Sequence, residues 1–252
     1  MPIDGIRIRG LRGLPEIRPG DDLCREILRA LANGVTAGPE PGAIFVVAQK
    51  AVSKAEGRLV SLADVEPSER ARLWAEESGR DSRVVEMILR EARRIVRMDR
   101  GILIAETQHG FVCANAGVDT SNVPPGYVTL LPVDPDASAR RLREGLETAL
   151  SRPVAVIISD TFGRPWRIGL VNVALGVSGL SPLIDYRGNV DSFGRPLQVT
   201  ILAIADELAA AAELVMGKTC GIPVAIIEGL GLTSTQGTGR DLIRSEGEDL
   251  FR

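Results

Sequence analysis

The sequence predicts a mixed helix-and-sheet fold, an α/β or α+β sandwich that divides into two subdomains. Helix-like and strand-like segments alternate along all 252 residues, which is the pattern of layered folds. Short runs rich in valine and isoleucine, such as residues 154–158, are bounded by polar residues, glycine or proline, as buried strands are. No internal repeat or low-complexity linker interrupts this alternation, so we expect residues 1–252 to form one domain.

The first half of the chain is predicted to hold three helices and one buried strand. Apolar residues recur at helical spacing over residues 23–31, and Asp21 and Asp22 before them suit an N-terminal cap. Residues 43–48 form an unbroken apolar run that predicts a buried strand. Two more helices are predicted at 68–78 and 82–96, because the second carries apolar residues on one face at helical spacing.

The second half begins with a predicted hairpin. Its strands are residues 102–106 and 111–114, and its turn is at His109 and Gly110. Further predicted elements are a strand at 127–131, an amphipathic helix at 139–150, an alanine-rich helix at 203–216 closed by Gly217, a strand at 224–227 and a glycine-rich loop at 229–239.

Composition excludes several function classes. The net charge of −3 and the 4% aromatic content argue against a nucleic-acid binder, which normally shows a basic excess and stacking platforms. No apolar run reaches the roughly 18 residues needed to span a bilayer. The N-terminus lacks the apolar core of a signal peptide, so we expect a cytoplasmic protein.

The cysteines and the single histidine offer little for catalysis. Cys24, Cys113 and Cys220 are isolated, which indicates neither a zinc site nor a disulfide framework and favours buried, inert thiols. His109 is the only histidine and falls in the predicted turn. A metal would therefore be bound mainly by oxygen ligands, which favours Mg²⁺ or Mn²⁺ over Zn²⁺.

The most informative segment is 159–167, Ser-Asp-Thr-Phe-Gly-Arg-Pro-Trp-Arg, directly after the predicted strand 154–158. Asp160 and Thr161 come at the C-terminal end of this strand, where α/β sheets usually place ligands. Two arginines and open backbone N–H groups near Gly163 follow, and this combination suits a metal-bound phosphate. A capped strand-to-loop junction explains the same residues.

Two further clusters are rich in groups that suit phosphate. The loop 10–17 is punctuated by glycines, which let a backbone approach a ligand closely. The basic run 49–58 leaves the predicted strand at Ala48 and suits a polyphosphate. A plain loop and a solvated charged face are the respective alternatives. Neither a Walker nor a Rossmann glycine motif occurs in the chain.

Two acidic clusters complete the set. Residues 115–122 combine one carboxylate, two hydroxyls and two amides, which suits a hard cation or, alternatively, a tight Asx-type turn. Residues 185–196, followed by Asp206 and Glu207, suit an anionic substrate or an exposed loop with internal ion pairs.

Several of these segments, taken in order, resemble the coenzyme F-420:L-glutamate ligase family. The resemblance runs from Gly13 to about Leu250 and implies an α+β fold of two intertwined subdomains. Some bacterial members carry an additional C-terminal flavin-binding reductase-like domain, and we expect this chain to be the ligase part alone. The segments that carry the resemblance are 48–58, 115–123, 131–136, 158–167 and 205–211.

The resemblance implies GTP-dependent amide formation. GTP would phosphorylate a carboxylate on the phospholactyl arm of the deazaflavin coenzyme F-420 precursor. The amine of L-glutamate would attack the acyl phosphate, with release of phosphate and GDP, and later glutamates would be joined through γ-linkages. The implied cofactors are Mn²⁺ or Mg²⁺ with K⁺ as a helper.

The resemblance also implies the residues of the site. Asp119 and Asp160 would hold the metal and serve catalysis, with Thr161 as an added oxygen ligand. Lys218 stands where some members carry an acidic residue, so the resemblance leaves open whether this loop supplies a metal ligand. Lys54 is expected to be exposed, so that Lys54→Ala leaves stability within about 0.5 kcal/mol. The residues implied to contact the nucleotide are Arg12, Gly13, Leu14, Pro15, Gln49, Lys50, Lys54, Asn122, Met216, Gly217, Lys218 and Gly221.

Two other functions remain open from the residues alone, a metal-dependent phosphatase or phosphotransferase and a non-catalytic deazaflavin- or nucleotide-binding protein. Glutamate-dependent release of GDP separates the ligase from both. We also expect a homodimer, because the hairpin around His109 and the strand 127–131 offer edges for another copy, and because the resemblance points to one.

Overall fold

The computed structural model describes residues 5–34, 38–231 and 236–249 and shows a central sheet of five strands. The strand order is β1-β12-β2-β8-β9. Strands β2 and β8 are parallel neighbours, and every other adjacent pair is antiparallel. The strands are β1 (Arg7–Gly10), β12 (Val224–Glu228), β2 (Ala43–Ala48), β8 (Val154–Arg164) and β9 (Arg167–Ser178).

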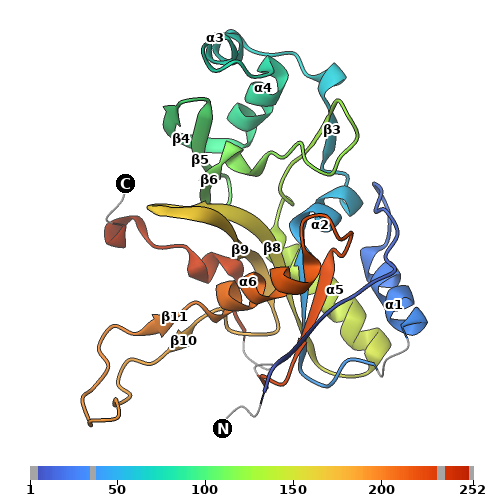
Figure 1. Cartoon of the computed structure of the whole chain (residues 1–252), viewed down its shortest axis with the longest axis vertical. Coiled ribbons are helices and arrows are strands. Elements are labelled where there is room, and N and C mark those ends of the chain that lie inside the picture. The colour runs from blue at the N-terminus through green and yellow to red at the C-terminus, as the bar shows by residue number, and fades with distance from the viewer. Residues whose placement is uncertain (1–4, 35–37, 232–235, 250–252) are drawn as a thin grey trace.

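Helices cover both faces of this sheet (Figure 1). One face packs against α1 (Leu23–Asn33), α2 (Gln49–Ala55) and α5 (Pro135–Leu150), and the other packs against α6 (Ile204–Met216). Successive residues of each strand alternate between the two cores because side chains on a strand point to opposite faces. In β2, for example, Phe45 is buried with α1 and α5, whereas Ile44 and Val46 are buried with α6.

A second, smaller layer lies beyond the ends of β8 and β9 (Figure 1). It has its own hydrophobic core, so helices and mixed sheets together confirm the predicted α+β class. Its elements are α3 (Glu69–Ser78), α4 (Ser82–Glu91), a sheet of β4 (Ala92–Asp99), β5 (Ile102–Thr107) and β6 (Val112–Ala114), and a pair of β3 (Leu59–Ser61) with β7 (Tyr127–Thr129).

Most predicted elements are present, but the predicted helix 82–96 is wrong in its last part. The helix α4 ends at Glu91, and β4 follows at once. The reason is a three-residue repeat: Ala92, Ile95 and Met98 pack against the small core, while the residues between them are exposed. Two register shifts in the β4–β5 pairing produce this spacing, because each bulge adds one residue to the period-two alternation of a strand. The apolar residues of β4 therefore recur every three residues, which in the sequence resembles the spacing of a helix.

The junction predicted after residue 158 is also corrected. Strand β8 continues through Asp160 and Thr161 to Arg164 and pairs with β9, which was not predicted. Arg164 donates to the carbonyl of Ile168 across the hairpin turn, so this arginine holds the turn. Asp160 and Thr161 therefore lie within a paired strand rather than on a loop.

A long arm joins β9 to α6 and extends away from the sheets (Figure 1). Its only strands are the short pair β10 (Ile184–Asp185) and β11 (Ile201–Leu202). Arg187 pairs with Asp185, and Asp191 accepts from two backbone N–H groups of its own turn. This is the exposed loop with internal ion pairs that was the alternative for residues 185–196. None of the described helices is both long enough and apolar enough to cross a membrane.

Candidate functional site

The candidate site is built where β2 ends beside Ser159 of β8, and β8 continues past this point in its pairing with β9. The helix α2 starts at Gln49, directly after β2, and this places Lys50 at the end of the sheet. Lys50 Nζ lies 2.8 Å from Asp119 Oδ2 and donates to the hydroxyl and carbonyl oxygens of Ser121, each at 2.7 Å. Two clusters that are 69 residues apart in sequence therefore meet in one ion pair.

The loop that carries Asp119 is shaped by its own polar side chains. Asp119 Oδ1 accepts from the backbone N–H of Ser121 at 2.7 Å, which is the Asx-type turn that was the alternative for residues 115–122. Burial raises the pKa of Asp119, but the hydrogen bonds from Lys50 and Ser121 outweigh burial and hold that pKa below its usual value. The Asp119 carboxylate is therefore ionised at neutral pH and faces Lys50.

Lys54 connects α2 to two loops. Its Nζ donates to the carbonyl of Asn122 at 2.8 Å and pairs with Glu16 Oε1 at 2.5 Å. Lys54 is only 7% exposed, so the expectation that it lies on the surface is wrong. The reason is its position one turn into α2, where the loop after β1 and the loop at 119–122 cover its stem.

The loop after β1 runs past this lysine and carries the four predicted residues 12–15. Leu14 packs against the main core, whereas Arg12, Gly13 and Pro15 are exposed. Gly13 has φ of +89°, a conformation that side chains rarely adopt. Glu16, the next residue of this loop, accepts a hydrogen bond from the predicted site residue Lys54.

Gln49 is held in one orientation at the start of α2. Ser53 Oγ donates to Gln49 Oε1 at 2.8 Å, which leaves the amide Nε2 without a hydrogen-bond partner although Gln49 is 1% exposed. A buried donor without a partner is unusual in a folded protein. Because Gln49 Oε1 accepts from Ser53, the side chain is held in one orientation. Its Nε2 group can donate a hydrogen bond to a bound molecule.

Asp160 carries the second carboxylate. Burial raises the pKa of Asp160 to about 6, the backbone N–H of Thr161 lowers it, and the charge of Asp119 raises it. The charges of Lys50 and Lys218 lower it. The charges of Asp119, Lys50 and Lys218 therefore all act on Asp160, and a pair of carboxylates is suited to a hard cation.

The donor set is short for a cation held by protein alone. Among residues 5–34, 38–231 and 236–249, no group of three or more His, Cys, Asp and Glu side chains gathers in a way that would hold a metal ion. Asp119 and Asp160 fit a Mg²⁺ or Mn²⁺ that takes its remaining ligands from phosphate oxygens and water, as Mg²⁺ does in nucleotide sites.

Thr161 and the loop after α6 meet on the other face of β8. Met216 is buried, and Gly217 follows with φ of +59° at the end of α6. Lys218 in this loop donates to Thr161 Oγ1. Thr161 in turn donates to Asn172 Oδ1 at 2.6 Å. Gly221 is exposed.

Sequence reasoning missed Asn172 and Glu213. Asn172 faces Thr161 across the β8–β9 ladder and donates to Glu213 Oε2 at 2.9 Å. No motif marks either residue, because their roles depend on a strand pairing that was not predicted. A simple signal did exist for the cations. Of the 30 basic residues only Lys50, Lys54 and Lys218 are lysines, and all three lie at this site.

The remaining candidates have structural roles. Asp206 accepts from the backbone N–H of Ala174 at 2.8 Å, and His109 Nε2 bonds the carbonyls of Pro132 and Val133. Cys220 is exposed, so the prediction of buried thiols is wrong for that residue. It stands on the loop after α6, whose short turn has no core to cover it.

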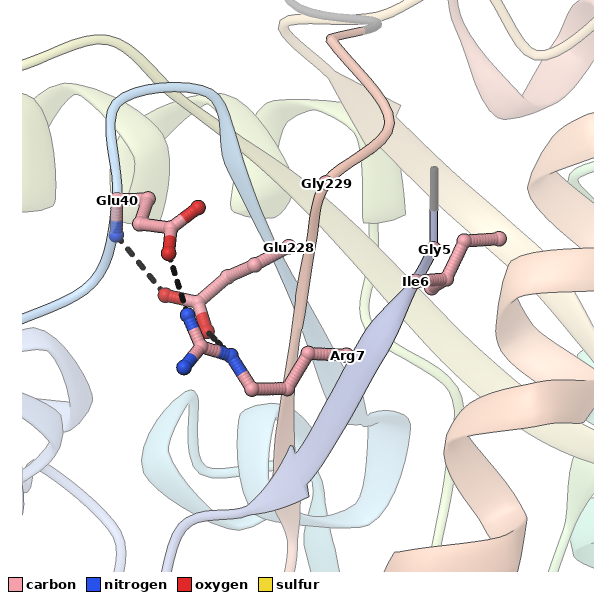
Figure 2. A pocket seen from close by; sticks show the side chains of 6 residues that line it. All are labelled: Gly5, Ile6, Arg7, Glu40, Glu228 and Gly229. Atoms are coloured by element: carbon pink, nitrogen blue, oxygen red, sulfur yellow. Dashed lines mark hydrogen bonds and ion pairs between the residues drawn. The ribbon is translucent and has the colours of Figure 1, made fainter. Parts of the chain in front are cut away.

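A surface cavity lies at the opposite end of the sheet (Figure 2). Figure 2 shows Glu228 at the end of β12 between Arg7 and Glu40. Glu228 is 3% exposed, accepts from the backbone N–H of Glu40 and pairs with Arg7 at 3.1 Å. None of the predicted site residues lines this cavity, and its lining holds one arginine and two glutamates that pair with one another.

Comparison with known proteins places the chain in one family. The family model described as F420-0:Gamma-glutamyl ligase matches residues 12–229. A protein of Methanopyrus kandleri named Coenzyme F420:L-glutamate ligase is 50% identical over 242 residues, which is 94% of each chain. The protein of that name from Methanothermobacter thermautotrophicus is 47% identical over 253 residues, covering 98% of this chain and 99% of the relative.

Proposed function

The chain belongs to the F420-0:gamma-glutamyl ligase family and is a ligase of that kind, and we propose that GTP drives its reaction. The proposed substrates are L-glutamate, GTP and the deazaflavin coenzyme F420 precursor. GTP phosphorylates the precursor's phospholactyl carboxylate, and the glutamate amine then displaces phosphate to form the amide. Further glutamates are added through γ-linkages.

One observation carries this proposal. Lys50 and Lys54 contact the loop that carries Asp119 where β2 ends beside β8, and Lys218 contacts Thr161, the neighbour of Asp160 in β8. This is the crevice in which sheets of this kind bind ligands. Phosphoryl transfer requires positioning and charge neutralisation more than covalent help from the protein, and this set of charges supplies both.

Each residue has a distinct task in this scheme. Lys50 and Lys54 attract the phosphate oxygens of GTP, and the free amide of Gln49 donates to an oxygen of the bound nucleotide. Asp119 and Asp160 hold Mn²⁺ or Mg²⁺, which when bound neutralises charge on the phosphates. Lys50 pairs with Asp119, so a cation held by Asp119 would share this carboxylate with Lys50 and would add positive charge beside the phosphate oxygens that Lys50 attracts.

One assay tests the reaction class. The purified chain is incubated with GTP, Mn²⁺, L-glutamate and the precursor, and products are measured by mass spectrometry together with GDP release. We expect a mass gain of whole glutamate residues and GDP release that depends on glutamate. Hydrolysis of GTP at the same rate without glutamate would instead assign a phosphatase, and ATP in place of GTP tests the choice of nucleotide.

We also propose that the chain forms a homodimer, and the exposed apolar side chains indicate the surface. Trp166, Ile168 and Leu170 at the β8–β9 turn are 82%, 101% and 67% exposed, and Phe193 on the arm is 85% exposed. The three side chains at the turn lie on one hairpin, and an exposed apolar surface of this kind is typical of a contact between proteins. We prefer this turn to the edges around His109 and residues 127–131, because Ile102, Val112 and Tyr127 on those edges are less exposed, at 55%, 38% and 38%.

A further inference from the structure

The ammonium of Lys218 belongs to a ring of four polar side chains. Lys218 donates to Thr161 Oγ1, and Thr161 donates to Asn172 Oδ1. Asn172 Nδ2 donates to Glu213 Oε2. Glu213 Oε1 lies 3.9 Å from Lys218 Nζ and closes the ring. The ring joins β8, β9, α6 and the loop after α6 beside the candidate site.

The direction of each hydrogen bond in the ring is fixed by chemistry. An ionised carboxylate only accepts, so Glu213 requires the amide nitrogen of Asn172 and turns its oxygen toward Thr161. Asn172 is 4% exposed and has little freedom to reverse. The hydroxyl of Thr161 has one proton, which it gives to Asn172, and its lone pairs therefore face Lys218.

The family resemblance implied that Thr161 is a metal ligand. The ring does not fit a metal ion on the Thr161 hydroxyl. A cation bound to the Thr161 oxygen would stand within a few ångströms of the Lys218 ammonium on the same neutral atom. Repulsion between the two charges at that distance is large unless anions lie between them. Lys218 therefore stands where a second cation would otherwise bind.

We propose that the Lys218 ammonium is the second positive charge of the site and binds an anionic phosphate oxygen of the substrates. The divalent cation is then held by Asp119 and Asp160 without Thr161, and no further cation is needed beside Thr161. The side chain of Lys218 is 59% exposed, so the ammonium has open space on the side away from the ring. A lysine suits this task because its compact charge binds phosphate as a point charge. This inference rests on the proposed function.

The first experiment measures metal binding rather than turnover. Mn²⁺ alone is titrated into the full chain, and free Mn²⁺ is followed by electron paramagnetic resonance, with and without GDP. We expect Thr161→Val to bind Mn²⁺ within about twofold of the parent chain and Asp160→Asn to bind it at least tenfold more weakly. Thr161→Ser, which keeps the hydroxyl, is the matched control for the lost methyl group. A tenfold loss in Thr161→Val but not in Thr161→Ser would overturn the proposal.

The second experiment measures how the charge of Lys218 changes the affinity for Mn²⁺ and for GTP. Lys218→Gln removes one positive charge, so Mn²⁺ affinity should stay equal or rise several-fold, while GTP binding weakens by roughly tenfold or more. Lys218→Arg keeps the charge and should lose less. Unchanged GTP binding in Lys218→Gln would refute the role. If these binding results hold but GDP release does not depend on glutamate, the ligase mechanism fails and the lysine's binding role stands.

Discussion

The small layer offers a prediction whose size follows from the structure, the replacement Glu86→Gln. Glu86 on α4 is 8% exposed and accepts from the backbone N–H and the hydroxyl of Ser68, the N-cap of α3. It also accepts from Arg90 Nε at 2.8 Å. Burial raises the pKa of Glu86, but these hydrogen bonds outweigh burial and lower the pKa to about 2.

The sign and the pH window follow from this shift. A carboxyl whose pKa is lower in the folded state stabilises the fold above its unfolded pKa, and that contribution is lost as the pH falls through the folded pKa. Here the window runs from about 4.5 down to about 2. The full shift corresponds to roughly 3 kcal/mol at 1.36 kcal/mol per unit. Because Arg90 is 49% exposed and water screens part of its effect, we expect about 2 kcal/mol.

Denaturant unfolding of the parent chain and of Glu86→Gln at pH 7, 5 and 3 measures this quantity. The difference in free energy of unfolding should be about 2 kcal/mol at pH 7 and should shrink toward pH 3. Glu66→Gln is the matched control, because Glu66 pairs with Arg72 on the surface and is 87% exposed, where such pairs contribute little. A difference that stays constant with pH, or that equals the control, would refute the reasoning.

Three further predictions concern the site and the assembly. Asp119→Asn and Asp160→Asn should each lose about 10²- to 10³-fold in kcat at saturating Mn²⁺ while the circular dichroism spectrum is retained; near-normal turnover in both would contradict the metal role. Lys54→Met should weaken GTP binding and, because Lys54 is buried, destabilise the fold by about 1–3 kcal/mol, which calorimetry with and without GTP measures; unchanged values of both would contradict its position. Light scattering should return about twice the 26.9 kDa chain mass, and Ile168→Asp should shift it to the monomer; a monomeric parent chain at micromolar concentration would exclude the dimer.

The sequence predicts the core elements well because each leaves a local signal. The unbroken apolar run of β2 identifies a strand buried on both faces, and Asp22 accepts from the backbone N–H of Arg25 as the expected cap of α1. The strand β9 leaves no such signal in its first part, where residues alternate weakly and are exposed. Its pairing with β8 depends on contacts between strands and on the turn at Trp166, which has φ of +59°.

The same limit applies to the site. Motifs marked Asp119, Lys50 and Asp160, but only the folded chain shows that Lys50 pairs with Asp119. The burial of a side chain also depends on the folded chain. Lys54 looks like a surface residue in a charged run, yet two loops cover it. The predicted residues Arg12 and Gly221 are exposed, and their nucleotide contacts stay predictions.

The distribution of lysine and arginine in the chain also points to the site. The chain uses 27 arginines and three lysines, and the arginines fill ion pairs throughout the surface, such as Arg141 with Glu56. A guanidinium is planar and donates two parallel hydrogen bonds to a carboxylate. An ammonium is compact and has three donors on one nitrogen atom. Lys50 uses this geometry to reach Asp119 and both oxygens of Ser121 at once. The chain uses arginine elsewhere and places its three lysines on α2 and on the loop after α6, and compact point charges are what a cluster of phosphate oxygens around one cation requires.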